Sequence, residues 1–409
     1  VIQENKDDPI ISLTSASVDK ISDLLPLFES IEAEEVQAIG KINFENFKVI
    51  NARISNLGQG ITPAEIALFS IDSVNSGNVE NILLEGLVIQ ENKDDPIISL
   101  TSASVDKISD LLPLFESIEV GNSRAIGRHV GNLLDFGSLK VNGLQVKSST
   151  SNDELNLDLF NIKLTRDNKL VNSMEIKLSG LEVDKYLLED EYELPAELLE
   201  SFKEDKLKLN TALSLNADYN ISEISTAITI GFDKIGEFSI ESIQGGFSRD
   251  LVNYALNNID SIGSREFTNR VDQNTTYKSL KFSFYNEGLM EILMREAQKN
   301  MNLTKEQMVQ MVSQEIDNSG PMLSTDIKTK IKKALTTFIK SGKGLEISIR
   351  SKDKDGVRGT KLIDSLMNGS ILKSIELDIK GFSSASPDAG QQQSQNDQDA
   401  PYKGLSPTF

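Results

Sequence analysis

Residues 207–215 read LKLNTALSL, and this stretch decides the fold class because its apolar side chains recur at every second position. Four leucines and Thr211 alternate with lysine, asparagine, alanine and serine. Alternation with period two is typical of a β-strand that buries one face and exposes the other. The stretch therefore predicts a strand of an antiparallel sheet covered on one side, rather than a strand of a doubly wound parallel sheet.

The same pattern continues outward along the chain. Further alternating positions are Leu155, Leu157 and Leu159, and then Met174, Ile176 and Leu178. Additional strands are predicted at residues 41–55, 82–89, 138–147, 222–232 and 237–243. Gly86, Gly143, Gly180 and Gly231 lie within or beside these runs, where glycine marks a bulge, a bend or a turn. We therefore expect an α+β, β-rich fold built on a long, curved antiparallel sheet.

The apolar period changes in the C-terminal third, after a strand predicted at 278–284. A helix is predicted at 286–300 with Asn286 as its cap, and Thr304 to Gln307 form a capping box that opens a second helix. A third helix is expected at 325–339. The remaining predictions are strands at 345–350 and 371–379 and a short helix at 361–367. Residues 383–409 have almost no apolar side chains and are predicted to be disordered.

An internal duplication marks the N-terminal third, because residues 88–119 repeat residues 1–32 letter for letter. In each copy a short apolar strand (97–100 in the second) precedes apolar residues near helical spacing, namely Val105, Ile108, Leu111, Leu112 and Phe115. Between the copies, Thr62 to Glu65 resemble a helix start that would carry Ile66, Leu68 and Phe69. We therefore expect strand-helix repeat units here.

These patterns predict four regions. Residues 1–135 hold the duplicated strand-helix units, residues 136–275 an antiparallel β-sheet, residues 276–382 an α+β unit with three helices, and residues 383–409 the disordered tail.

The composition disfavours several classes of function. Sixty-two acidic residues against 42 basic residues give a formal net charge of −20, which repels phosphate backbones and argues against nucleic-acid binding. The chain has no cysteine, so disulfides, thiol nucleophiles and cysteine-bound zinc are not available. No apolar run has the roughly 20 residues of a transmembrane helix. We expect any signal peptide or anchor to lie upstream of Val1, and we expect no metal or cofactor.

Catalytic signals are weak. His129 is the only histidine, and no nucleophile elbow accompanies it. Gly58 and Gly60 are similar to a dinucleotide-binding loop, but the predicted helix start explains them. Gly342 is explained by the end of a helix rather than by a phosphate-binding loop. Residues 351–356 are similar to the start of a calcium loop but lack its final glutamate, so we interpret them as a charged turn. A carboxylate-dependent hydrolase is kept as a distant alternative, because acidic residues cluster at Glu189, Asp190, Glu191, Glu193, Glu197 and Glu200.

Strands that end in Gly-Leu suggest a relationship. Residues 82–87 read ILLEGL and residues 176–181 read IKLSGL. Strands with these Gly-Leu ends, together with the strand and helices at 280–315, resemble those of the β-rich bacterial envelope proteins of the AsmA-like and YdgA-like groups. The resemblance implies a role in the periplasm or cell envelope, in envelope maintenance or lipid handling, and it provides no catalytic residue.

Two hypotheses follow for the function. In the first, a non-enzymatic envelope protein holds lipid or another apolar ligand in a groove of the sheet. The expected lining is Leu155, Leu157, Leu159, Ile176, Leu178, Leu213 and Leu215. The plain structural alternative is that these residues only pack against the helices. In the second hypothesis, the chain is a structural or protein-interaction module whose repeated N-terminal units bind a protein partner. A groove wider than a packed core favours the first hypothesis, and an exposed helix face favours the second.

Overall fold

The fold is described from a computed structural model of the chain. The residues that it describes are 10–18, 20–22, 43–55, 64–75, 78–92, 95–109, 137–147, 154–167, 170–184, 205–257, 263–318, 325–361 and 371–382. Structural statements below concern these residues.

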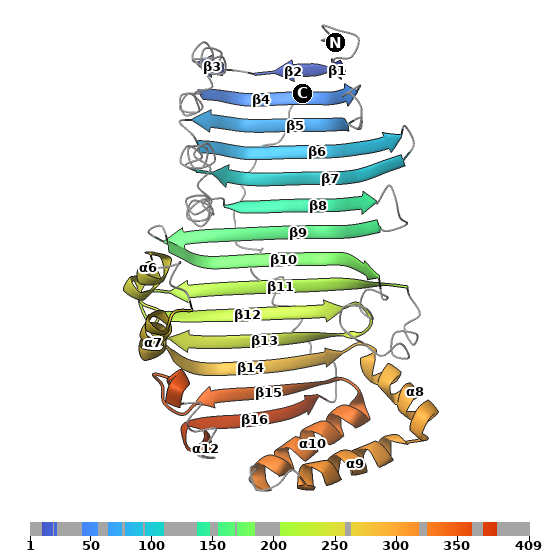
Figure 1. Cartoon of the computed structure of the whole chain (residues 1–409), viewed down its shortest axis with the longest axis vertical. Helices are drawn as coiled ribbons and strands as arrows, with labels where there is room; N and C mark the ends of the chain where they lie inside the picture. Colours follow the sequence, from blue (N-terminus) through green and yellow to red (C-terminus); the bar gives the residue numbers. More distant parts are fainter. Residues whose placement is uncertain are drawn as a thin grey trace, which may run out of the picture.

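One sheet of sixteen strands forms the body of the molecule, and every pairing in it is antiparallel (Figure 1). Strand β4 pairs with β1, β2 and β3, and from β4 to β16 each strand pairs with the next along the chain. The strands are β1 (Ile10–Ser12), β2 (Ser15–Ser17), β3 (Lys20–Ser22), β4 (Asn43–Ser55), β5 (Ala64–Asn75), β6 (Asn78–Asn92), β7 (Asp95–Ile108), β8 (Ser138–Lys147), β9 (Glu154–Asp167), β10 (Leu170–Asp184), β11 (Lys206–Asp218), β12 (Glu223–Phe232), β13 (Gly236–Gly245), β14 (Thr276–Asn286), β15 (Gly344–Ser351) and β16 (Ile375–Phe382).

The described helices all belong to the C-terminal part of the chain. They are α6 (Arg249–Asn257), α7 (Arg265–Asn274), α8 (Leu289–Met301), α9 (Lys305–Asn318), α10 (Thr325–Ser341) and α12 (Ile371–Ser374). Figure 1 shows α6 and α7 at one end of the strands and α8, α9 and α10 beside the other end. The predicted fold class, a β-rich protein with a long antiparallel sheet and helices near the C-terminus, is confirmed.

Helices α8, α9 and α10 form a small core. Met290, Met294 and Ile339 are buried together, with Met308 and Phe338 packed against them. The predicted capping box opens α9: the Gln307 amide donates to Thr304 Oγ1, and the Thr304 amide donates to Gln307 Oε1. The Asn286 side chain likewise accepts a hydrogen bond from the Met290 amide at the start of α8.

A row of left-handed residues crosses the N-terminal half of the sheet on alternate strands. Its members are Asn51 in β4, Gly86 in β6, Gly143 in β8 and Gly180 in β10, with φ of 49, 62, 60 and 66°. A left-handed residue of this kind acts as an extra residue in its strand. In β10, for example, Leu178 and Leu181 are three residues apart but pair with Thr211 and Leu209, which are two apart, so the register shifts between them. The predicted irregularity is confirmed at the three glycines, whereas Gly231 continues β12 without a positive φ.

Two predicted helices are wrong. Residues 64–75, which include Ile66, Leu68 and Phe69, form strand β5, and Val105 and Ile108 lie in β7. The sheet therefore replaces the predicted strand-helix units, and the rest of the second prediction, at 111–115, lies outside the described residues. At the C-terminal end the predicted strand 371–379 begins as the short helix α12 and becomes β16 at Ile375. Helices α6 and α7 were not predicted.

The sheet continues across two predicted region boundaries, since β7 pairs with β8 and β13 pairs with β14. Of the predicted short helix at 361–367, Lys361 is helical, and residues 362–367 lie outside the described residues, as does the tail 383–409.

Candidate functional site: an apolar face of the sheet

A row of apolar side chains runs across the sheet from β4 to β16. Each member is the direct pairing partner of the next one, so their side chains project from the same face. The row consists of Phe47, Ile71, Ile82, Val105, Leu139, Ile162, Ile176, Leu213, Ile228, Ile240, Phe282, Ile347 and Ile379. No polar residue interrupts it.

A second row lies two residues along each strand on the same face. It consists of Val49, Phe69, Leu84, Ala103, Val141, Phe160, Leu178, Thr211, Ile230, Phe238, Phe284, Leu345 and Gly381. Thr211 is its only polar member, and its hydroxyl donates to the backbone carbonyl of Thr229. We call the side of the sheet from which both rows project the apolar face.

The structure places six of the seven predicted lining residues on the apolar face. Ile176 pairs with Leu213, and Leu215 lies beside them opposite Met174. Strand β11 has no left-handed residue, so Thr211 and Leu209, two positions apart, project from the same side of the sheet. They pair with Leu178 and Leu181 of β10, which lie on either side of Gly180. The apolar side chains of β10 therefore project from the same side of the sheet before and after Gly180.

Leu155 and Leu157 lie beyond that row on the same face, where they pair with Val146 and Leu144. Leu159 does not belong to the lining. It precedes Phe160 directly and pairs with Asn142 and Ser179, so its side chain projects from the opposite face. Leu157 and Phe160 face the same side of the sheet although they are three residues apart, so the alternation of β9 changes between them.

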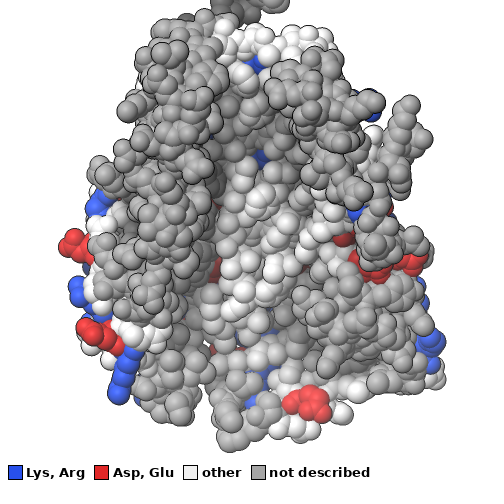
Figure 2. All heavy atoms as spheres, turned by 45° about the horizontal axis from the view of Figure 1, so that its top comes forward, with Lys and Arg blue, Asp and Glu red and all other residues white. Residues whose placement is uncertain are grey.

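The middle of the apolar face is open among the described residues. Ile228, Ile230 and Phe238 are 38, 45 and 41% exposed, although they are large apolar residues within β12 and β13. Phe238 packs only loosely on Phe282, with ring centroids 6.5 Å apart. In Figure 2 a band of uncharged residues runs along the middle of the face in view, with the acidic and basic side chains gathered mainly toward the margins. These three residues were missed from the sequence lining, although residues 222–232 and 237–243 were predicted as strands.

Helix α10 covers the last strands of the sheet. Phe338 of this helix contacts Phe284 in an edge-on arrangement with centroids 5.9 Å apart, and Ile327, Ala334 and Ile339 are buried. The position of Gly381 explains the close approach, because a Cβ there would lie 2.3 Å from the Ala334 carbonyl oxygen. The apolar face is thus a packed core at β16 and becomes open toward β12 and β13.

The opposite face carries ion pairs. Lys208 lies 3.3 Å from Asp158 and 3.9 Å from Glu182, and Lys206 lies 3.7 Å from Glu182. Farther along, Lys281 pairs with Glu241 at 3.0 Å and Glu346 at 3.6 Å. Burial alone lowers the pKa of Lys281, but its hydrogen bond to Glu241 and the two carboxylate charges raise it above its ordinary value. The two faces of the sheet therefore differ sharply in polarity.

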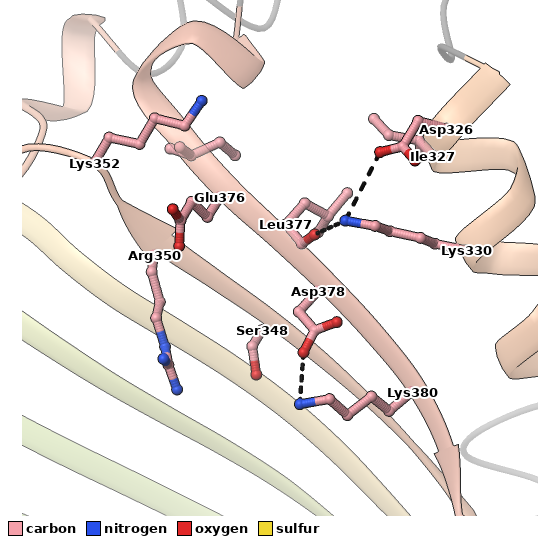
Figure 3. A pocket seen from close by; sticks show the side chains of 11 residues that line it. Asp326, Ile327, Lys330, Ser348, Arg350, Lys352, Glu376, Leu377, Asp378 and Lys380 are labelled. Carbon is pink, nitrogen blue, oxygen red and sulfur yellow. Dashed lines mark hydrogen bonds and ion pairs between the residues drawn. The ribbon is translucent and has the colours of Figure 1, made fainter.

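A charged depression of about 530 Å³ lies where α10 meets β16 (Figure 3). Lys330 in it contacts Asp326 at 3.8 Å and donates to the Leu377 carbonyl, and Lys380 contacts Asp378 at 2.5 Å. The hydrogen bond from Lys380 holds the pKa of Asp378 below its usual value. Because both lysines have acidic partners, we assign this depression a structural role.

The candidate metal-binding and catalytic motifs of the sequence were compared with the described residues. No group of three or more metal-ligating side chains occurs among them. His129, the glycines at 58 and 60, and the acidic residues between 189 and 200 lie outside the described part of the chain. Gly342 ends α10 with φ of 63°, and Asp353 to Gly356 form a hydrogen-bonded turn, as expected. Within the described helices, none has the length and apolar character that crossing a bilayer requires.

Comparison with known proteins gives limited information. A search of curated proteins found no match. The model of a family of uncharacterised proteins matches residues 229–381, which extend from within β12 to β16 and include α6 to α10.

Proposed function

We propose that this chain is a non-enzymatic protein that holds a lipid or another apolar ligand against the apolar face of its sheet. The observation that carries the proposal is the uninterrupted apolar row from β4 to β16, in which Ile228 is exposed, together with the exposed Ile230 and Phe238 of the neighbouring row. Contiguous apolar surface of this kind is characteristic of ligand-binding grooves and interaction sites.

Acyl chains suit this face better than a ligand recognised through hydrogen bonds. The neighbouring polar side chains are already satisfied: Thr211 bonds to a backbone carbonyl, and Thr226 and Ser242 bond to each other at 2.7 Å. Burying acyl chains yields about 25 cal/mol per Å² of apolar surface and needs no polar partner. A long, featureless apolar strip therefore favours an extended hydrocarbon over a compact polar substrate.

The cell location belongs to the same proposal. A place in the periplasm or bacterial envelope rests on the resemblance to AsmA-like and YdgA-like proteins. The alternative is a structural or protein-interaction module of the envelope, in which a partner protein covers the same face. The two differ in what the purified chain retains, because a lipid carrier binds acyl chains without any second protein.

Paired substitutions on opposite faces test the proposal. Ile230→Glu places a charge on the apolar face, whereas Ile243→Glu places the same charge on the opposite face at a similar exposure of 36%. We expect Ile230→Glu to weaken binding of a fluorescent fatty acid by about tenfold or more, because an unpaired charge would be desolvated by the acyl chain. Ile243→Glu should bind as the unchanged chain does.

Fluorescence titration of the three proteins gives the result, with circular dichroism as the check on folding. Equal affinities for Ile230→Glu and Ile243→Glu would show that the fatty acid does not use the apolar face.

A further inference from the structure

The open part of the apolar face follows two neighbouring strands. The exposed residues Ile228 and Ile230 belong to β12, and the exposed Phe238 belongs to β13. The row that contains Ile228 includes Leu213 of β11 and Phe282 of β14, and both of these residues are only partly exposed. The open surface therefore runs along β12 and β13 rather than across the sheet.

The paired residues of β12 and β13 on this face form what we call the open strip. At about 3.3 Å per residue, the part of β12 from Ile230 to Ile224 covers about 20 Å. An acyl chain of a membrane lipid spans about half of the roughly 30 Å hydrocarbon core of a bilayer. One acyl chain can therefore lie along the open strip. The pairs of the strip are Ile230 with Phe238, Ile228 with Ile240, Thr226 with Ser242, and Ile224 with Gln244.

Two uncharged polar side chains lie together at one end of the open strip. Gln244 pairs with Ile224 on one side and with Tyr277 of β14 on the other, so all three side chains project from the apolar face. The Gln244 amide nitrogen donates to Ser242 Oγ at 3.4 Å, whereas its amide oxygen accepts no hydrogen bond from the described residues. The Tyr277 hydroxyl likewise has no partner among them. This end of the strip therefore offers one acceptor and one donor to a ligand.

The backbone and ring of Tyr277 are held in place although the side chain is 40% exposed. Its amide donates to the Val357 carbonyl at 2.8 Å, and its carbonyl accepts from the Val357 amide at 2.9 Å. The ring lies against Gly359, where a Cβ would be 3.3 Å from Tyr277 Cε2. A tyrosine with an apolar ring and a polar tip suits a boundary between hydrocarbon and water. Tyr277 therefore marks the place where an acyl chain ends and a polar group begins.

The other end of the open strip is less suitable for a polar group. The turn between β12 and β13 contains Asp233, whose carboxylate already accepts a hydrogen bond from Asn210 at 2.6 Å. Glu237 and Glu287 are near this turn, and burial together with the charge of Glu287 raises the pKa of Glu237. A ligand group placed here would meet acidic side chains that are already crowded. The polar end of a ligand therefore belongs at Gln244 and Tyr277.

We propose that the ligand is an amphiphile whose acyl chain lies along β12 and β13 and whose uncharged, hydroxyl-bearing end contacts Gln244 and Tyr277. This inference rests on the proposed function, because it assigns the end of the ligand that the apolar face holds. The Gln244 amide oxygen accepts from a ligand hydroxyl, and the Tyr277 hydroxyl donates to an ester carbonyl. The neighbouring cation Lys278 is already paired with Glu223 at 2.8 Å, so an anionic end gains no free charge partner from it.

Two unlabelled ligands of equal chain length test the inference by displacing a fluorescent fatty acid. A monoacylglycerol has an ester and free hydroxyls, whereas a fatty acid methyl ester has the same ester without hydroxyls. We expect the unchanged chain to bind the monoacylglycerol about fivefold more tightly, which is the effect of one additional hydrogen bond.

Three variants identify the residues involved. Gln244→Leu should remove the preference for the monoacylglycerol and keep binding of the methyl ester. Tyr277→Phe should weaken both esters by about fivefold and leave the preference unchanged. Tyr285→Phe is the matched control, because Tyr285 lies in the same strand but projects from the opposite face, so both affinities should stay the same. Circular dichroism checks that each variant folds.

The outcomes separate this inference from the proposed function. Equal affinities of the unchanged chain for the two esters, or a preference that survives Gln244→Leu, would overturn the polar end while acyl binding stands. Tighter binding of an unlabelled fatty acid than of the monoacylglycerol would show that the end is anionic and would also overturn the inference. If the fluorescent fatty acid does not bind at all, the proposed function fails and this inference fails with it.

Discussion

Replacing Gly86 by alanine should lower the free energy of unfolding by about 2–4 kcal/mol. The left-handed backbone at φ of 62° costs a residue with a side chain about 1–2 kcal/mol. A Cβ at this position would also lie 2.8 Å from the Cβ of Ala67, which has no rotamer to relieve the contact. Such overpacking adds about 1–3 kcal/mol. Urea unfolding followed by circular dichroism measures the loss.

Two further variants separate the causes. Gly231→Ala is the matched control, because Gly231 also lies within a strand but has no positive φ, and its nearest neighbours are 3.4 Å from the added Cβ. We expect a change below about 1 kcal/mol there. Adding Ala67→Gly to Gly86→Ala should recover the part of the loss that comes from the contact. If Gly86→Ala is no more harmful than Gly231→Ala, the left-handed row does not organise the sheet.

Leu100→Ala and Leu13→Ala form the second large prediction. Both leucines have the same neighbours in sequence, but Leu100 is buried between two strands and Leu13 lies at the edge. Truncating a buried leucine costs about 2–5 kcal/mol, whereas a change at a half-exposed edge position costs less than about 1 kcal/mol. We therefore expect a large fall in unfolding free energy for Leu100→Ala only.

Hydrogen exchange supplies a local readout for the same pair. Leu100→Ala should increase amide exchange in β6, β7 and β8, and Leu13→Ala should affect only β1 to β4. Equal losses of stability at both positions would mean that the two copies have equivalent environments, contrary to the fold.

Much of the sheet was predictable because apolar and polar residues alternate along the sequence of a half-buried strand. The predicted strand 138–147 coincides with β8, and 41–55 and 222–232 match β4 and β12 to within two residues. Residues 64–75 were misread because Thr62 to Glu65 resemble a helix start. The spacing of three between Ile66 and Phe69 is also compatible with a helix. The same spacing separates Val105 from Ile108 in β7. Pairing with long strands on both sides overrides the local helix signal.

The site was predictable only in part for the same reason. The alternating residues of β10 and β11 were assigned to the correct face, because no interruption falls between Met174 and Leu178 or within 207–215. Leu159 was misassigned because the face changes between Leu157 and Phe160. The exposure of Ile228, Ile230 and Phe238 depends on which strands the helices cover. The periodicity of the sequence does not show how far α10 extends over the sheet.

Native mass spectrometry of the chain purified from a bacterial host, combined with lipid extraction, tests the central claim most directly. If the apolar face holds lipid, the protein should carry acyl species in stoichiometric amounts, and Ile230→Glu should lose them while Ile243→Glu retains them. A clean mass of the polypeptide alone, unchanged after incubation with fatty acid, would contradict lipid holding and favour a face that a protein partner covers.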